Sequence, residues 1–344
     1  MAMMIVRYRE ADRVRWGRLA GTAPARAGDV VTVEPIVSDA TTTGALLAEL
    51  ESQRAVATTA ATQIAATQLM SPVSTDARLV CQGLNYASHA AEAQQHVRRS
   101  NLIFAKASSS LTGPFSNVVR PAEVELLDYE VEIGLVMRRH ICEATDITEE
   151  NIGDVVAGVV LCNDVSARDV MFGASFLQWF QGKSYRTFCP AGPVLYWLSR
   201  SEVAETLEHL QIKLWLNGEL RQSASSAQLI FKPAETLASL SQQLDLRRGD
   251  MLLTGTPGGV TAPASQKLVE ILKVHLMADT IRRDELRVEM VKTRPFMQPG
   301  DIVTATLVDT LNNRPLGGQE NTIAAAEPAQ KARSAADSIS RAAS

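Results

Sequence analysis

The chain has 344 residues, of which 46% are hydrophobic and 21% charged, and its formal net charge is −4. This composition is typical of a globular protein and gives no reason to expect a nucleic-acid or anionic-membrane partner. The first residues bring in charges too early for a secretory signal, and no apolar run reaches the roughly 20 residues of a membrane span. Four scattered cysteines without a C-x-x-C pair indicate reduced thiols, so we expect a cytoplasmic protein.

Residues 1–70 are expected to form a small N-terminal domain. Residues 4–21 alternate as a β-hairpin would, and residues 44–53 favour a helix. The stretch that follows, 71–78, reads as a linker. A larger domain is then expected over residues 71–325.

This larger domain is predicted to be mostly β. Asn217-Gly218 is a typical hairpin turn, and helices are expected after Asp146 and within residues 166–180 and 232–244. Because the predicted strands and helices do not alternate in a βαβ pattern, an α+β fold is favoured over a doubly wound one. Runs rich in β-branched and aromatic residues, bounded by turn residues, predict strands at 78–86, 101–106, 129–138, 155–164, 192–198, 212–223, 250–257 and 301–310.

Two segments differ from this pattern. Residues 263–293 are more charged and helix-like than their surroundings, which indicates an insert. Residues 326–344 are rich in Ala and Ser and predict a disordered tail.

Glu130 and Glu132 lie within an expected buried strand. A strand has a side-chain period of two, so both carboxylates point to one face. Burying both carboxylates without a counter-charge costs free energy, which a bound divalent cation would offset. The alternative is an edge strand whose acidic face is solvated. Asp164 ends another apolar strand. Three carboxylates suit Mg²⁺ or Mn²⁺ better than zinc.

Other polar residues suggest catalysis less specifically. His89 and Glu92 share one face of an expected short helix, where Glu92 could orient His89 as a general base; a surface pair is the alternative. Lys183 lies in an expected Gly/Ser-flanked loop, and could equally be solvated. Thr254 and Thr256 flank a glycine in what could be only a tight turn.

Taken in order, these motifs resemble the fumarylacetoacetate hydrolase superfamily over roughly residues 79–323. The motifs that carry the resemblance are GLNYxxHxxE, FxKxSSSLxGP, DYEVEIG, NDVSARD, GKSYRTFxPxGP, NGE, GDxxxTGTPxGV and PGD. The resemblance implies a mixed β-sandwich roll, a homodimer, and Mg²⁺ or Mn²⁺ held by three acids that match Glu130, Glu132 and Asp164.

The resemblance also implies further site residues. The His-Glu dyad, on a lid that orders over substrate, matches His89 and Glu92, and the substrate-binding lysine matches Lys183. The substrate site would also include Lys106, Arg168, Met171 and Thr256. Three features depart from the family pattern: Met171 replaces a frequent Gln, the 263–293 insert follows the glycine-rich loop, and QQHVRRS precedes residue 101.

The resemblance implies, as the main expectation, a metal-dependent hydrolase that cleaves a carbon–carbon bond of an acylpyruvate-type β-diketo acid. His89 would activate water, and the metal and Lys183 would stabilise the enolate that leaves. The alternative is a 2-oxo acid decarboxylase, tautomerase or isomerase/hydratase of aromatic catabolism on the same metal site. A third hypothesis is a non-catalytic binding protein.

Overall fold

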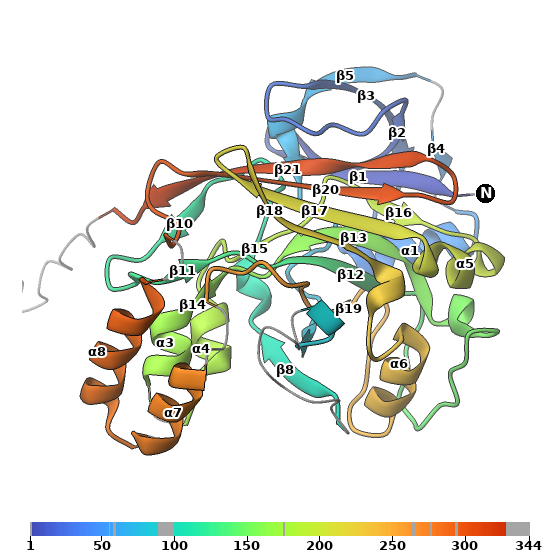
Figure 1. Cartoon of the computed structure of the whole chain (residues 1–344). Helices are drawn as coiled ribbons and strands as arrows, with labels where there is room; N and C mark the ends of the chain where they lie inside the picture. The colour runs from blue at the N-terminus through green and yellow to red at the C-terminus, as the bar shows by residue number, and fades with distance from the viewer. Residues whose placement is uncertain are drawn as a thin grey trace, which may run out of the picture.

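The computed structural model describes residues 2–54, 56–57, 60–88, 100–174, 176–262, 266–275, 277–292 and 295–327. Within these residues the largest element is a 12-stranded mixed sheet, seen across the middle and top of Figure 1. β5 (Thr62–Ala65) and β6 (Leu69–Met70) pair with its strands β3 and β1. The main path runs β4 (Val56–Ala57), β3 (Val30–Val37), β2 (Arg13–Ala20), β1 (Met3–Glu10), β16 (Leu195–Trp197), β13 (Val156–Asn163), β12 (Val131–Met137), β19 (Met251–Leu253), β7 (Leu79–Gly83) and β8 (Leu102–Lys106).

A second, five-stranded sheet packs against this one. Alternation explains the packing, because Val131 and Ile133 of β12 enter the same apolar core as Ile212 of the second sheet. Two short pairs, β11 (Leu127–Asp128) with β14 (Ser166–Ala167) and β15 (Cys189–Pro190) with β9 (Leu111–Thr112), complete the β structure described. The second sheet has the order β10 (Val118–Arg120), β21 (Arg314–Ala325), β20 (Ile302–Asp309), β17 (Leu210–Leu216) and β18 (Glu219–Ser225).

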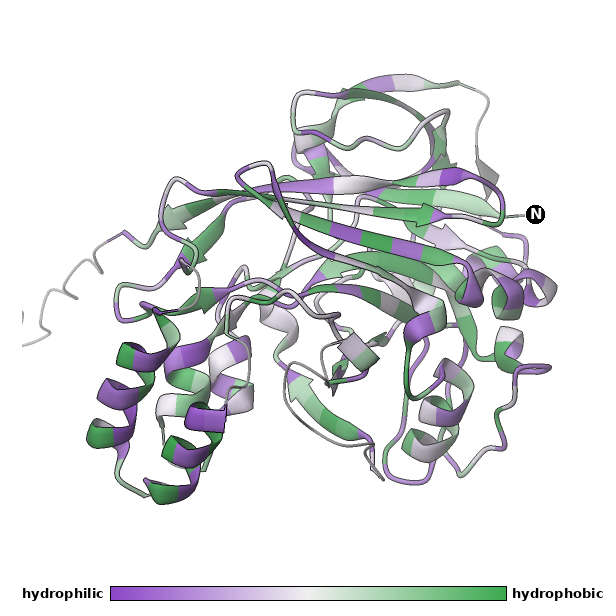
Figure 2. Cartoon of the chain, viewed as in Figure 1, coloured by the Kyte–Doolittle hydropathy of each residue, from purple (hydrophilic) through white to green (hydrophobic). Residues whose placement is uncertain are grey.

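The helices lie around these sheets, and four of them gather at one end of the molecule (Figure 1). These four are α3 (Arg168–Gly173), α4 (Trp179–Lys183), α7 (Gln266–Val274) and α8 (Asp279–Met290). The others are α1 (Thr43–Glu51), α5 (Val203–Glu208) and α6 (Pro233–Ser241). Figure 2 shows hydrophobic and hydrophilic residues alternating along α7 and α8. Their apolar sides meet in a small core that contains Leu268, Ile271 and Leu286.

Most predicted elements are confirmed. β1 and β2 form the expected hairpin, α1 and α6 lie where helices were predicted, and α7 and α8 give residues 263–293 the predicted helical character. Asn217 and Gly218 both have positive φ, 51° and 82°, as their turn requires. The helix predicted after Asp146 is wrong, because this stretch forms only a 3-10 turn at Ile152–Asp154 before β13 begins.

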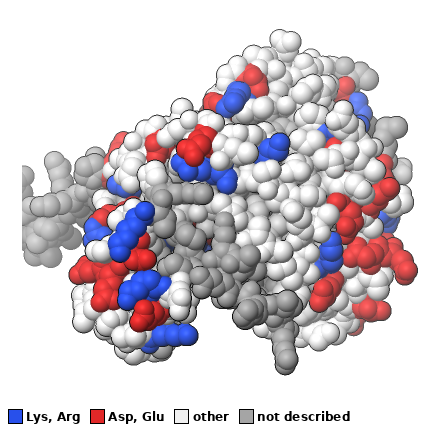
Figure 3. Space-filling model, viewed as in Figure 1, with Lys and Arg blue, Asp and Glu red and all other residues white. Residues whose placement is uncertain are grey.

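The N-terminal strands join the main sheet through β1, which pairs with β16. The division into domains at residue 70 therefore stays a prediction. Residues 328–344 of the predicted tail lie outside the described residues. Within the described part of the chain, no helix is both long and apolar enough to cross a membrane. Figure 3 shows acidic and basic side chains interspersed over α7 and α8, as on a solvated surface.

Candidate metal centre and active site

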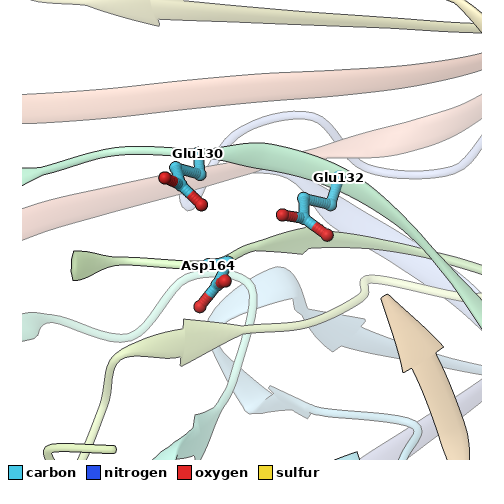
Figure 4. A group of neighbouring side chains, drawn as sticks. All are labelled: Glu130, Glu132 and Asp164. Atoms are coloured by element: carbon cyan, nitrogen blue, oxygen red, sulfur yellow. The ribbon is translucent and has the colours of Figure 1, made fainter. Parts of the chain in front are cut away.

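Two neighbouring strands bring three acidic side chains together. Glu130 directly precedes β12, Glu132 lies within it, and Asp164 follows β13. Their side chains point into one shared space (Figure 4). One carboxylate oxygen from each lies within 4.8 Å of the others, and all three residues are buried. The prediction that these acids form one cluster is confirmed.

Antiparallel pairing explains why Asp164 joins the two glutamates. Val131 lies opposite Asn163, and the next pair continues this register because the Asp164 N–H donates to the Glu130 carbonyl at 2.7 Å. Residues directly opposite each other in an antiparallel pair project to the same face. Glu130 and Glu132 share that face because they are two residues apart. Local periodicity and one strand pairing therefore build the cluster.

Glu132 is the most isolated of the three acids. The Gly255 N–H donates to its Oε2 at 2.8 Å, whereas Oε1 is buried and has no hydrogen-bond partner among the described residues. Burial raises the pKa of Glu132 well above its usual value, and the nearby Asp164 and Glu130 raise it further. An unpartnered buried carboxylate oxygen facing two other carboxylates is what a cation site requires.

Two cationic side chains hold these acids. Lys183 donates to Glu130 Oε2 at 2.7 Å, to Asp164 Oδ2 at 2.6 Å and to the Ser166 hydroxyl at 2.8 Å. Arg168 bridges Glu130 Oε1, at 2.5 Å, and Asp128 Oδ2, at 3.0 Å. Burial alone would lower the pKa values of Lys183 and Arg168, but the adjacent carboxylates raise both above their ordinary values. Both side chains therefore stay charged.

The structural position of Lys183 differs from the one predicted from the sequence. It is the last residue of α4 rather than part of a loop, and only 1% of it is exposed. Its Nζ also lies 5.2 Å from the centroid of the Phe104 ring. The alternative of a solvated lysine is therefore wrong.

Lys106 supports the cluster from the other side. Its Nζ donates to Asp164 Oδ1 and to the carbonyl oxygens of Phe188 and Val165. These bonds occupy all three ammonium donors. Lys106 does not line the cavity that adjoins the acids, so the geometry favours a positioning role toward Asp164, and direct substrate binding by Lys106 stays a prediction.

The donor set fits a hard divalent cation. Three clustered carboxylates offer oxygen ligands, the kind that Mg²⁺ and Mn²⁺ prefer. The ionised forms of Asp128 and the three clustered acids carry four negative charges, and Lys106, Lys183 and Arg168 carry three positive ones. One negative charge is thus uncompensated within this set, which a cation would offset.

The glycine-rich loop closes one side of the site. Thr256 donates to the Val131 carbonyl at 2.9 Å and accepts from Gln222 Nε2 at 2.8 Å. Gly255 has a φ of +92°, which favours glycine and allows its N–H to reach Glu132. Thr254 donates to the Ile133 carbonyl and does not line the cavity. The loop therefore turns the chain and also attaches to β12 through both threonines.

A cavity of about 250 Å³ adjoins the acid cluster. Glu130, Arg168, Lys183 and Thr256 lie at its polar end, and Met171 lines the wall beside them. The rest of the wall is mainly apolar and comes from β8, α3, α4 and α7, with Leu102, Phe104, Phe172, Trp179, Leu268 and Leu272 among its residues.

The structure thus brings together Glu130, Glu132, Asp164, Lys106, Arg168, Met171, Lys183 and Thr256. His89 and Glu92 lie outside the described residues. Sequence reasoning missed Asp128 and Gln222, which anchor Arg168 and Thr256. Asp128 shares the parity of Glu130 and Glu132, and this D-x-E-x-E alternation could have identified it. Gln222 comes from another sheet and left no local signal.

Comparison with known proteins identifies the class of protein. The family model described as "Fumarylacetoacetate (FAA) hydrolase C-terminal" matches residues 78–324. The chain belongs to this family of enzymes, and the resemblance predicted from the motifs is confirmed.

Two curated relatives carry a more specific description than the family model. A protein of Bos taurus described as "Oxaloacetate tautomerase FAHD2B, mitochondrial" is 39% identical over 193 residues, which is 56% of this chain and 59% of the relative. The rat oxaloacetate tautomerase is also 39% identical, over 194 residues and with the same coverage. The chain thus spans less than two thirds of the length of these curated relatives.

A solved structure matches almost the whole chain. The structure of a probable 2-hydroxyhepta-2,4-diene-1,7-dioate isomerase from Mycobacterium abscessus is 26% identical, with a TM-score of 0.67, and the match covers 95% of this chain and 100% of that one. The predicted α+β, mostly β fold with a small N-terminal β region is confirmed by this match. These three relatives are tautomerases and an isomerase by name, so they favour the alternative function over the hydrolase.

Proposed function

We propose that this protein is a divalent-metal-dependent tautomerase of 2-oxo acids. The observation that carries the proposal is the buried cluster of Glu130, Glu132 and Asp164, which lies with Lys183 and Arg168 at the polar end of a cavity. The names of the relatives support tautomerisation over hydrolysis. A 2-oxo acid carries the anionic, oxygen-rich end that such a site would bind.

The three acids would hold Mg²⁺ or Mn²⁺. When bound, the cation would supply Lewis-acid polarisation of the substrate's 2-oxo group. The reaction breaks the C3–H bond, whose electron pair forms the C2–C3 double bond while negative charge moves to the C2 oxygen. Protonation of that oxygen then gives the enol. Lys183 and Arg168, fixed beside the cavity, would lower the energy of the developing charge.

A base must take the proton from C3. Among the described residues that line the cavity there is no histidine. We assign this step to His89, oriented by Glu92, as the resemblance implies. The same base would serve the reverse reaction.

Isomerisation of a longer 2-hydroxydienoate is the second candidate. The Mycobacterium abscessus structure favours it, because that match extends over the N-terminal strands as well as the catalytic region. Such a reaction moves a double bond by the same proton transfer, so the site would need no further group.

Deuterium exchange at C3 of two 2-oxo acids, oxaloacetate and phenylpyruvate, followed by NMR in D₂O with product analysis, tests the proposal. With Mg²⁺, the enzyme should speed exchange above a protein-free Mg²⁺ blank and release no new product, whereas EDTA or Glu132→Gln should abolish the excess. Formation of acetate and oxalate would instead show hydrolysis, and formation of pyruvate would show decarboxylation. Either product at a rate matching the exchange would overturn the tautomerase assignment.

We also propose a cytoplasmic homodimer, as the sequence and the resemblance predict. The Bos taurus relative is described as mitochondrial, so the location needs its own test. Light scattering of the purified chain measures the oligomeric state, and fractionation of cells measures the location.

A further inference from the structure

Three aromatic rings line the cavity, and the first of them, that of Phe104, lies beside Lys183. The Phe104 and Trp179 rings lie 5.1 Å apart, and those of Phe172 and Trp179 lie 6.3 Å apart, both edge to face. These rings come from β8, α4 and α3, so three separate elements contribute to one row. Edge-to-face rings at such distances attract one another and hold the wall in a fixed shape.

Helix α7 forms another part of the cavity wall through Leu268, Val269 and Leu272. Leu268 is buried in the small core with α8, whereas Val269 and Leu272 are only half-buried. This helix belongs to the 263–293 segment, which stands out in the sequence as a departure from the family pattern.

The backbone is strained where the wall turns. Phe176 and Leu177 have φ values of 58° and 57°, in the left-handed region that side chains rarely adopt. Leu177 lines the cavity, whereas 65% of Phe176 is exposed. Such strain persists where the surroundings require it, often at ligand sites.

The net charge at the polar end of the cavity bears on the net charge of the substrate. The four carboxylates and three cations leave one uncompensated negative charge, and a divalent cation would turn this into one positive charge. A single substrate carboxylate balances that charge. No described lining residue of the apolar part carries a charge that could pair with a second carboxylate.

From these observations, and resting on the proposed function, we infer that the substrate is a monoanionic 2-oxo acid whose distal group is aryl or branched alkyl, and that Leu272 and the aromatic row determine this specificity. The acid head binds at Glu130, Arg168 and Lys183. The distal group enters between Trp179 and Leu272. Oxaloacetate shares the head but places a second carboxylate against the apolar wall.

Three ligands with one head group test the inference. Oxamate, N-phenyloxamate and N-oxalylglycine mimic the 2-oxo acid end and differ in carrying no distal group, a phenyl ring or a carboxylate. Calorimetry with the Mg²⁺-loaded protein should give N-phenyloxamate about tenfold or more tighter binding than oxamate, because the ring buries apolar surface. N-oxalylglycine should bind no tighter than oxamate.

Two variants of α7 sharpen the test. Leu272→Arg places a cation in the apolar wall, so it should weaken N-phenyloxamate about tenfold and strengthen N-oxalylglycine. Val274→Arg adds the same charge to the same helix at a side chain that is 67% exposed and outside the cavity, so it should change neither affinity.

The outcomes separate the two proposals. Absence of oxamate binding with Mg²⁺ would overturn the proposed function itself. Oxamate binding together with N-oxalylglycine preferred over N-phenyloxamate would overturn only the specificity for an apolar distal group. If thermal melting shows that Leu272→Arg does not fold, the ligand series on the unmodified protein decides the question alone.

Discussion

At one end of the cavity, Glu130 accepts hydrogen bonds from the charged side chains of Lys183 and Arg168. At the other end, Trp179 and Leu272 present apolar surface. The polar end combines the acids beside β12 and β13 with Arg168 of α3 and Lys183 of α4. The apolar end is built mainly from the helices α3, α4 and α7.

This difference indicates that α7 contributes to specificity alone, whereas α3 and α4 contribute side chains to both ends of the cavity. The register of β12 and β13 fixes the acids, and a shift of one residue would turn Glu130 and Glu132 into the core. Helix α7 contacts the cavity without entering the sheet, so its side chains can change without disturbing the acids. Substitutions should therefore be able to affect one end at a time.

The largest effect is expected at the acid cluster. Glu130→Gln or Asp164→Asn removes a proposed metal ligand. Mutation of a group that only supports a ligand already lowers metal affinity about 10–100-fold. These variants should therefore lose more than about 100-fold in Mg²⁺ affinity and all measurable turnover. Calorimetric Mg²⁺ titration gives the affinity. Glu205→Gln, at an exposed acid of α5, is the control. Full activity of the unmodified protein in EDTA would contradict the metal assignment.

The next effect concerns the base. His89→Ala should slow C3 exchange by roughly 10²–10⁴-fold if His89 takes the proton. Glu92→Gln should cost less, because Glu92 only orients the imidazole. Mg²⁺ affinity, measured on both variants, should not change. Unaltered exchange in His89→Ala would mean that another group moves the proton.

Lys106 gives a smaller effect through Asp164. Lys106→Met leaves Asp164 without one of its two ammonium partners, so Mg²⁺ affinity should fall by about 10–100-fold as the carboxylate loses its fixed orientation. The ratio of N-phenyloxamate to oxamate affinity should stay constant, since Lys106 does not line the cavity. Lys267→Met, at a lysine on the surface of α7, controls for the lost charge. A changed ratio with unchanged Mg²⁺ affinity would assign Lys106 to substrate binding.

The smallest effect is expected at Met171, where the two ends meet. Its sulfur lies 3.7 Å from Arg168 Nη1, and its side chain lines the cavity. Met171→Gln introduces an amide that an apolar distal group leaves unpaired, at a cost of about 1 kcal/mol, or roughly fivefold. The ratio of kcat/KM for phenylpyruvate to that for oxaloacetate should fall accordingly. A ratio that rises would place the distal group elsewhere.

The acid end could largely be predicted from the sequence, and the apolar end could not. Alternation marked Glu130 and Glu132, the end of an apolar strand marked Asp164, and the motif order marked Lys183 and Arg168. Leu102 and Trp179 meet across one cavity although they come from distant segments, and only tertiary packing joins them. Periodicity describes each element by itself, so a wall made from several elements leaves no local signal.

The incorrect expectations have physical causes as well. Lys183 was placed in a loop because Gly and Ser flank it, yet packing against Phe104 and the acids stabilises a short helix there. The stretch after Asp146 has helix-forming residues, but Gly153 packs directly against the Arg200 backbone, where a Cβ would lie only 2.0 Å from the Arg200 carbonyl oxygen. Tertiary contact overrides local propensity at both places.

A crystal structure with Mn²⁺ and N-phenyloxamate, using anomalous scattering from the metal, tests both ends of the cavity together. One anomalous peak is expected between Glu130, Glu132 and Asp164, with the oxamate head beside it. The phenyl ring should lie between Trp179 and Leu272. A peak away from these three carboxylates would rule out the proposed metal site, and a ring that points out of the cavity into solvent would rule out the proposed specificity.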